Sequence, residues 1–118
     1  MQVRYKNKKL EKLCTDLKEA KKKYSGEIPE KLLSVINFIN SASNLTDLIN
    51  YPPFHFHPLA GTRCGQYAID IGGRRSGYRL IFMPINNDGT TCTNEQIYSA
   101  SAVNVIIIQA EEVTNHYE

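Results

Sequence analysis

Two histidines and three arginines lie in the middle of the chain, and they are the side chains best suited to acid–base chemistry and to binding an anion. His55 and His57 alternate with phenylalanines, so a strand here would carry both imidazoles on one face. Arg74 and Arg75 follow a Gly-Gly pair, and Arg79 lies inside the next apolar stretch. Because burying such groups without partners is costly, we expect them on an open, polar sheet face that meets an anion.

Three short strands joined by two turns are expected to position these groups. The first covers residues 54–57, and Pro58 and Gly61 end it. The second covers residues 67–71, where large apolar residues alternate with Ala68 and Asp70. The third covers residues 78–82, after the Gly72-Gly73 turn.

Helices are expected before these strands. Residues 8–24 have apolar side chains on one helical face and lysines mostly on the other. Pro29 fits the first turn of a second helix with its own apolar stripe. Asn44 followed by Asp47 resembles a capping box for a short helix at residues 45–50, which two prolines then stop.

Two further strands complete the expected fold, a short one at residues 3–5 and a buried, central one at residues 103–108. Between the sheet's last hairpin and that strand, residues 84–102 are polar, with a turn at residues 86–89 and a helical turn or hairpin extension near residues 95–98. Helices followed by consecutive strands predict one α+β domain over residues 1–118, with two N-terminal helices packed on a mostly antiparallel β-sheet.

Composition excludes several classes of protein. The chain has 118 residues, 42% of them hydrophobic, and no apolar run approaches the roughly 18 residues that span a bilayer. The first residues lack an apolar signal segment, so we expect a cytoplasmic protein with no membrane partner. Three cysteines without CxxC spacing argue against a disulfide scaffold or a zinc site, and we expect no metal or other cofactor.

The net charge of +2 is unevenly distributed. Residues 1–60 carry 10 Lys and Arg against 6 Asp and Glu, whereas residues 61–118 carry 4 against 6. The excess lies in the first expected helix, where Lys8, Lys9 and Lys12 begin a run of basic residues. This run is either a solvated helix face or a patch that meets phosphates.

Three sequence elements together resemble the HigB-type toxins of the RelE/ParE superfamily of bacterial toxin–antitoxin systems. They are His57-Pro58-Leu59-Ala60-Gly61, then Gly65-Gln66-Tyr67-Ala68-Ile69, then Tyr78-Arg79-Leu80-Ile81-Phe82. The order and length of the whole chain also resemble the family, including the Tyr-containing end. The family lysine after Pro-Leu is Ala60 here, and the Asp-Tyr-His tail of the family is His116-Tyr117-Glu118.

The resemblance implies a RelE-like, microbial-RNase-like fold and a ribosome-dependent endoribonuclease that cuts mRNA by attack of a 2′-hydroxyl on the adjacent phosphate. It also implies a helix-turn-helix antitoxin similar to HigA, with operator DNA bound only through that antitoxin. His57, Arg79 and Tyr117 match family positions and are the implied catalytic residues, with Glu118 as a further candidate base. Arg74, Arg75 and the lysines of the first helix would hold mRNA or ribosomal RNA.

Residue chemistry agrees with these roles without fixing them. Histidine can accept or donate a proton near neutral pH, and arginine offers two parallel hydrogen bonds to a phosphate. Each residue also has a structural interpretation, because Arg79 could pair with Asp70 on the neighbouring strand. Two alternatives therefore stay open: a non-enzymatic, ParE-like inhibitor of DNA gyrase, and a degenerate homologue that only binds an antitoxin.

Overall fold

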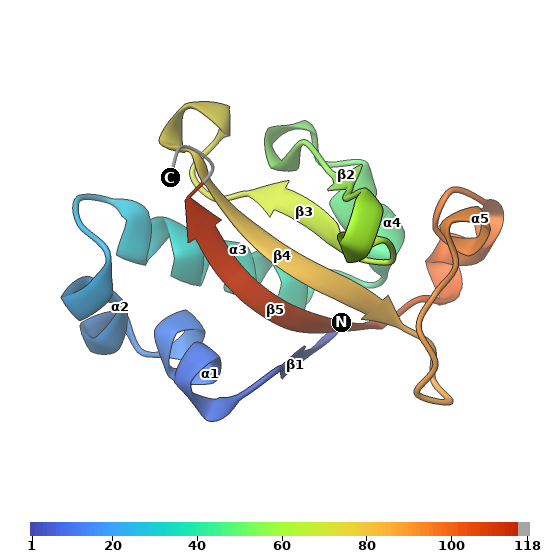
Figure 1. Cartoon of the computed structure of the whole chain (residues 1–118), viewed down its shortest axis with the longest axis horizontal. Helices are drawn as coiled ribbons and strands as arrows, with labels where there is room; N and C mark the ends of the chain where they lie inside the picture. The colour runs from blue at the N-terminus through green and yellow to red at the C-terminus, as the bar shows by residue number, and fades with distance from the viewer. Residues whose placement is uncertain (116–118) are drawn as a thin grey trace.

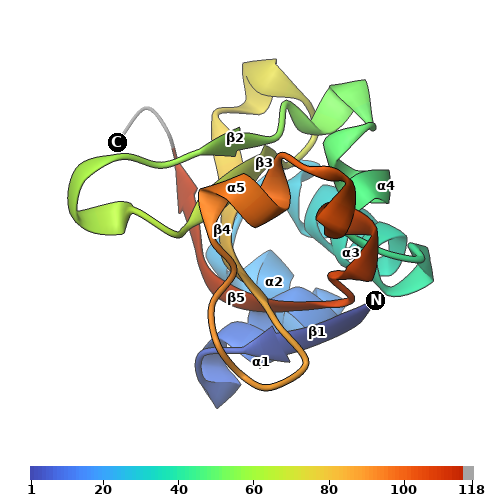
Figure 2. The ribbon, with the colours of Figure 1, turned by 90° about the vertical axis from the view of Figure 1, so that its right-hand side faces the viewer.

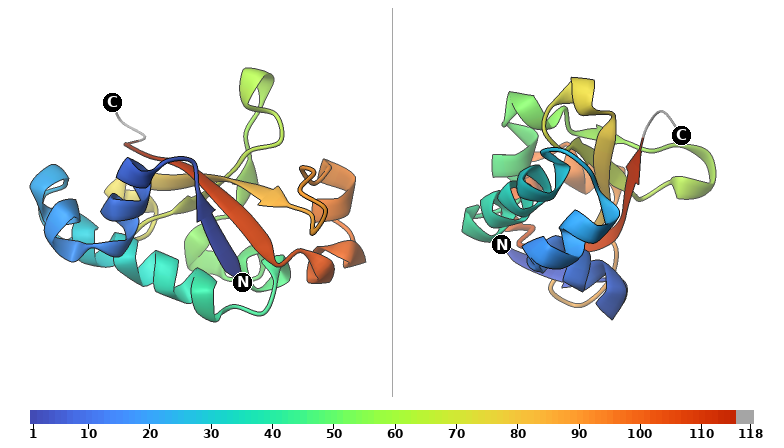
Figure 3. Two further views of the ribbon diagram at one scale, coloured as in Figure 1. Left: turned by 90° about the horizontal axis from the view of Figure 1, so that it is seen from below. Right: turned by 90° about the vertical axis from the view of Figure 1, so that its left-hand side faces the viewer.

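The computed structural model describes residues 1–115 and shows an α+β fold built on a mixed five-stranded sheet. The strand order is β1-β5-β4-β3-β2; β1 runs parallel to β5, and the other neighbours are antiparallel. Figures 1 and 3 show the N-terminal helices on one face of this sheet. The strands are β1 (Gln2–Tyr5), β2 (His57–Pro58), β3 (Tyr67–Asp70), β4 (Tyr78–Ile85) and β5 (Ile107–Asn115).

The α-helices are α1 (Lys8–Thr15), α2 (Leu17–Lys23), α3 (Ile28–Ser41), α4 (Leu45–Ile49) and α5 (Asn94–Ile97). Four 3₁₀ turns join them to the strands: η1 (Pro52–Phe54), η2 (Gly61–Arg63), η3 (Arg74–Ser76) and η4 (Ala100–Asn104). None of the helices in residues 1–115 has both the length and the apolar character that crossing a bilayer requires.

The first expected helix is in fact two helices that meet at Asp16. Asp16 has an extended backbone, with φ −120° and ψ 107°, and its side chain accepts hydrogen bonds from the N–H groups of Lys18 and Glu19. A carboxylate at this position caps a new helix N-terminus and favours it electrostatically. The apolar spacing therefore continued through residues 8–24, but the capping chemistry of one residue interrupts the helix.

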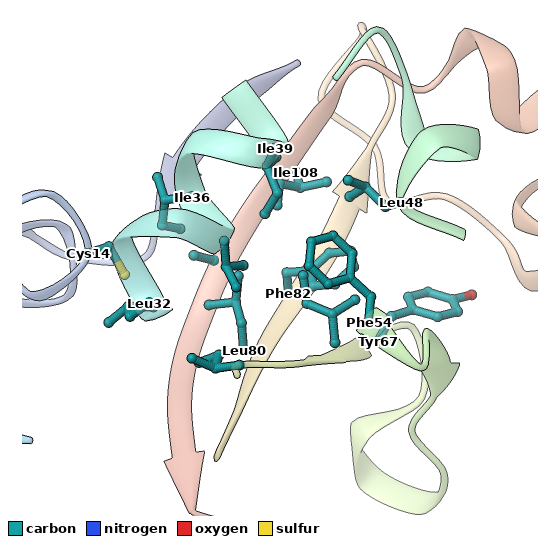
Figure 4. Close-up of a cluster of buried hydrophobic side chains, with 14 of the residues drawn as sticks. Cys14, Leu32, Ile36, Ile39, Leu48, Phe54, Tyr67, Leu80, Phe82 and Ile108 are labelled. Carbon is teal, nitrogen blue, oxygen red and sulfur yellow. The ribbon is translucent and has the colours of Figure 1, made fainter. Parts of the chain in front are cut away.

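The second and third expected helices are confirmed. Pro29 lies in the first turn of α3, and the side chain of Asn44 caps α4 by accepting a hydrogen bond from Thr46 N–H. Leu32, Ile36 and Ile39 of α3 are buried against the sheet. Figure 4 shows the side chains of the core cluster between the helices and the strands, among them Leu80 and Phe82 of β4.

The expected strand at residues 54–57 is wrong. Pro52 to Phe54 form a 3₁₀ turn, and His55 N–H donates to the Pro52 carbonyl at 3.0 Å. His55 then adopts a left-handed backbone with φ 45°, so β2 begins only at His57. The two prolines fix φ near −65° and remove two N–H donors, which favours the turn over a ladder of hydrogen bonds.

The expected last strand is displaced toward the C-terminus. Residues 100–104 form η4, Val103 and Ile106 are exposed, and β5 begins at Ile107 and continues to Asn115 among the residues described. The strand lies between β1 and β4, as a central strand should. Its second half is mostly polar and only half-buried, which explains why the apolar run predicted only its beginning.

The polar connection between β4 and β5 contains local structure. A turn closes with Asn86 N–H donating to the Thr90 carbonyl at 2.8 Å, and α5 follows close to the expected helical turn. Figure 2 shows this connection at one end of the sheet. Tyr67 of β3 contacts it by donating a hydrogen bond to the Asn94 side chain. The connection therefore lengthens one edge of the molecule.

Candidate functional site

The register of the sheet brings three polar side chains together on the face away from the helices. Asp70 of β3 pairs with Arg79 of β4, and His57 of β2 pairs with Ala68 of β3. Because side chains alternate along a strand, His57, Asp70 and Arg79 share one face, while Tyr67, Ile69 and Leu80 point to the core. The expected sheet face that carries histidine and arginine is thus present, although Ala68 and Asp70 on it are buried.

A pocket of about 390 Å³ lies over these side chains. Its lining consists of two imidazoles, three guanidinium groups, one carboxylate and one glycine: His55, His57, Arg74, Arg75, Arg79, Asp70 and Gly77. With three permanent cations against one carboxylate, the pocket favours an anionic ligand.

His57 and Arg79 are in direct contact. Arg79 Nη1 lies 3.1 Å from His57 Nε2, and His57 Nδ1 lies 2.7 Å from the carbonyl oxygen of His55. A carbonyl only accepts and a guanidinium only donates, so these partners assign a neutral imidazole that carries its proton on Nδ1. Nε2 is therefore the proton-accepting atom, and Arg79 holds it in place.

His55 lies beside His57 because of its unusual backbone. With φ 45°, it is the one non-glycine residue in residues 1–115 that has a positive φ. The two imidazole rings lie 4.9 Å apart, centroid to centroid, with an interplanar angle of 33°. His55 Nδ1 is 3.9 Å from Asp70 Oδ2, which is too far for a hydrogen bond. Non-glycine residues in this conformation are strained by about 1 kcal/mol or more, and such strain is common at functional sites.

Asp70 and Arg79 each leave a buried polar atom without a partner. Asp70 is 6% exposed, and its Oδ2 has no hydrogen-bond partner in the described structure. The same holds for Arg79 Nε. The alternative interpretation, an ion pair between these two residues, is not found among the contacts of residues 1–115, although their strands place them opposite one another. Orphaned buried groups are costly, and a ligand in the pocket would satisfy them.

Arg74 and Arg75 enter the pocket from the turn between β3 and β4. Gly73 and Gly77 flank this turn with φ 84° and 77°, values that side chains other than glycine rarely adopt. The hydroxyl of Ser76 donates to the Ile71 carbonyl and accepts from Tyr78 N–H at 3.1 Å, which fixes the turn to both strands. Both arginines are exposed, so they can move toward a ligand.

The predicted lysines do not join this pocket. Lys8 lines a shallow depression beside β1, and Lys9 and Lys12 line another between α1 and α2. The strand order places β1 and β2 at opposite edges of the sheet, so α1 and the pocket lie on different sides of the molecule (Figure 1). Tyr117 and Glu118, the other two predicted catalytic residues, lie outside the described residues.

The loop between β2 and β3 adds a further contact to the face away from the helices. Arg63 forms an ion pair with Glu112 of β5 and donates from Nε to Gln66 at 2.9 Å. Since β4 separates β3 from β5, this loop reaches across β4 (Figure 3). Ala60, where the resembled family has lysine, is exposed in the same loop and adds no charge to the pocket.

Sequence reasoning placed His55 with His57 on the anion-meeting face but assigned it no role, and it considered Asp70 only as a possible partner of Arg79. Asp70 gave a usable signal, since an acidic residue alternating with large apolar residues faces the same side as the arginine opposite it. The left-handed backbone that brings His55 to the pocket has no signal in the sequence. No set of three potential metal ligands occurs in residues 1–115.

Comparison with known proteins does not assign the chain. No protein-family model matches it, and no curated protein matches it either. The site is therefore interpreted from its own geometry, which is a cationic pocket with one oriented imidazole and one buried carboxylate whose Oδ2 has no hydrogen bond.

Proposed function

We propose that this chain is a HigB-like toxin of the RelE/ParE superfamily that cleaves mRNA on the ribosome. The observation that carries the proposal is the contact between His57 Nε2 and Arg79 Nη1 at 3.1 Å, inside a pocket that Arg74 and Arg75 also line. An oriented proton acceptor beside a cluster of guanidinium groups suits attack of a 2′-hydroxyl on a phosphate. The α+β fold, with helices on one face and a polar site on the other, supports a RelE-like arrangement.

The chemistry follows from these contacts. A phosphate in the pocket accepts hydrogen bonds from Arg79, including from Nε, which has no partner in residues 1–115. Arg79 then turns from His57 toward the phosphate, and Nε2 becomes available for proton transfer. The charge that develops on the phosphorane oxygens is stabilised by the three arginines. Tyr117 and Glu118 would contribute from the C-terminal end, as the resemblance implies.

The partners of this proposal follow from the resemblance. A HigA-like helix-turn-helix antitoxin would neutralise the toxin and connect it to operator DNA. Lys8, Lys9 and Lys12 lie on the far side from the pocket, so in this proposal they face ribosomal RNA while the pocket meets mRNA. The cell compartment would be the cytoplasm, where ribosomes translate.

The test is a primer-extension map of a reporter mRNA, with and without translating ribosomes. We expect cuts at fixed positions within codons that appear only with ribosomes, and that disappear with His57→Ala or Arg79→Ala. Asp88→Asn, in the exposed turn after β4, is the matched control and should cut like the unaltered protein. Intact mRNA from folded protein that still arrests growth would contradict the nuclease and favour a ParE-like inhibitor of DNA gyrase.

A further inference from the structure

The buried carboxylate of Asp70 is the feature that phosphate binding does not explain. A pocket built only to attract an anion would gain from excluding a carboxylate. Asp70 is nevertheless 6% exposed within it, and its Oδ2 has no hydrogen-bond partner. Within residues 1–115 its ionisable neighbour is His55, with Nδ1 at 3.9 Å, and no arginine lies within ion-pair distance. A ligand that satisfies both orphaned atoms must therefore offer an acceptor to Arg79 Nε and a hydrogen-bond donor to Asp70 Oδ2.

Asp70 also lies at the boundary between the cationic pocket and a second groove. This groove, of about 310 Å³, is lined on its other sides by α3 and η1, through residues that include Lys31, Phe38 and Tyr51. The Tyr51 ring contacts Phe38 at 4.6 Å and remains 38% exposed. An aromatic ring that packs against Phe38 and Phe54 and is still partly exposed offers a surface on which a nucleic-acid base can stack.

The order of these features matches the order of groups in a nucleotide. Arginines, then a carboxylate, then an exposed aromatic ring correspond to phosphate, then sugar, then base. The short β2 makes this possible, because it pairs only with Tyr67 and Ala68 and leaves the Asp70 end of β3 uncovered. In ribose, the group beside the 3′-phosphate that can donate a hydrogen bond is the 2′-hydroxyl.

We propose that Asp70 accepts a hydrogen bond from the 2′-hydroxyl of the nucleotide whose 3′-phosphate occupies the arginine pocket, so that this residue selects ribose over deoxyribose. In the bound state the single proton of the 2′-hydroxyl points to Asp70, and the hydroxyl rotates toward His57 Nε2 before the proton transfer of the proposed function. This inference rests on the proposed function for its substrate class and assigns a specificity-determining residue to it. Asp70 Oδ2 gains its missing donor, and the base lies in the groove beside Tyr51.

The test is a binding titration that needs no cleavage and no ribosome. The ¹⁵N-labelled protein is titrated with adenosine 3′-monophosphate and, separately, with 2′-deoxyadenosine 3′-monophosphate, and the dissociation constants are measured by NMR into the millimolar range. We expect the ribonucleotide to bind about tenfold more tightly, the size of one hydrogen bond to a charged group. Asp70→Ala should abolish this ratio, and Asp70→Asn, which keeps the side-chain shape, should at least halve it.

The controls separate sugar recognition from charge. Arg75→Ala should weaken both nucleotides by a similar factor and keep the ratio, and Asp88→Asn should change neither constant. Equal binding of the two nucleotides, or binding of neither, overturns the proposal. A preference for guanosine over adenosine that Asp70→Ala removes, with the sugar ratio unchanged, would also overturn it and indicate recognition of a base edge.

The inference and the proposed function fail in different experiments. Ribosome-dependent cleavage together with no ribose preference would refute the role of Asp70 and keep the nuclease. A ribose preference that depends on Asp70, together with no cleavage under any condition, would keep the sugar contact and refute the nuclease.

Discussion

The hydrogen bond between His57 and Arg79 predicts how strongly substitutions of the two residues, alone and together, should slow mRNA cleavage. Removing a donor that stabilises transition-state charge costs about 10²- to 10³-fold in rate, and we expect this loss for Arg79→Ala. His57→Ala should lose about 10²- to 10⁴-fold, the contribution of a positioned acid or base. If the residues acted independently, the double variant would lose about 10⁴- to 10⁷-fold.

The structure predicts a much smaller loss for the double variant. Arg79 Nη1 orients the His57 ring at 3.1 Å in the unliganded site, and the His55 carbonyl holds its other nitrogen. In the proposed reaction Arg79 then holds the phosphate beside His57, so part of what His57 does is lost once Arg79 is gone. Residues that act as a unit are strongly non-additive. We expect the double variant to fall within about tenfold of the slower single variant.

The assay is single-turnover cleavage of mRNA on ribosomes stalled at one codon, for the four proteins of this mutant cycle. Urea unfolding provides the control, and each single variant should stay within ~1 kcal/mol of the unaltered protein, because Arg79 has neither an ion pair nor a partner for Nε in residues 1–115. A double variant whose loss equals the product of the two single losses would refute the coupling. A fully active Arg79→Ala protein would refute the site.

Three further predictions concern titration, reactivity and backbone strain. Burial raises the pKa of Cys14 from 9.0 to about 12, so as pH rises the thiol ionises in the unfolded chain before it ionises in the folded protein. The free energy of unfolding should therefore fall as pH rises above 9, by up to ~1.4 kcal/mol per pH unit from this group. Cys14→Ala should make that fall less steep, as measured by urea titrations at about pH 8 and about pH 10.5. Cys64 is exposed whereas Cys14 and Cys92 are buried, so Ellman's reagent should modify one thiol quickly in folded protein and three after denaturation. His55→Gly should relieve the left-handed strain and leave stability unchanged or raised by about 1 kcal/mol, and a loss above 1 kcal/mol in urea unfolding would contradict that strain.

Hydrophobic periodicity predicted the parts of the fold that depend on burial. The apolar stripe of α3 and the alternation along β3 and β4 were sufficient, because each of these elements has one face in the core. Local hydrogen bonding decided the parts that were missed. Asp16 divides the first helix by capping α2, and the residues before β5 form η4 although they are apolar. Periodicity carries no information on either choice.

In the site, too, burial patterns predicted the strand pairing, whereas the hydrogen bonds of individual side chains could not be predicted. Predicting that β3 and β4 are adjacent was enough to bring Asp70 and Arg79 to one face, but the sequence did not show that Arg79 turns to His57 and leaves Asp70 unpaired. That choice depends on the side chains that surround the guanidinium in three dimensions. The assignment of Lys8 to an RNA surface, on the other side of the molecule, stays a prediction that no contact in the structure tests.

The failure of the expected strand at residues 54–57 explains why a pocket exists. In the antiparallel register that pairs His57 with Ala68, a continuing strand would place residue 55 opposite Asp70. Its backbone would extend the ladder and cover the carboxylate from the edge. The turn over Pro52–Phe54 and the left-handed His55 end the pairing after two residues, so Asp70 stays reachable from the cationic pocket and from the groove beside Tyr51. The strain at His55 and the Asp70 oxygen without a hydrogen bond thus have one structural origin, a strand that stops short, and the opening beside it is lined by three arginines, two histidines and one carboxylate.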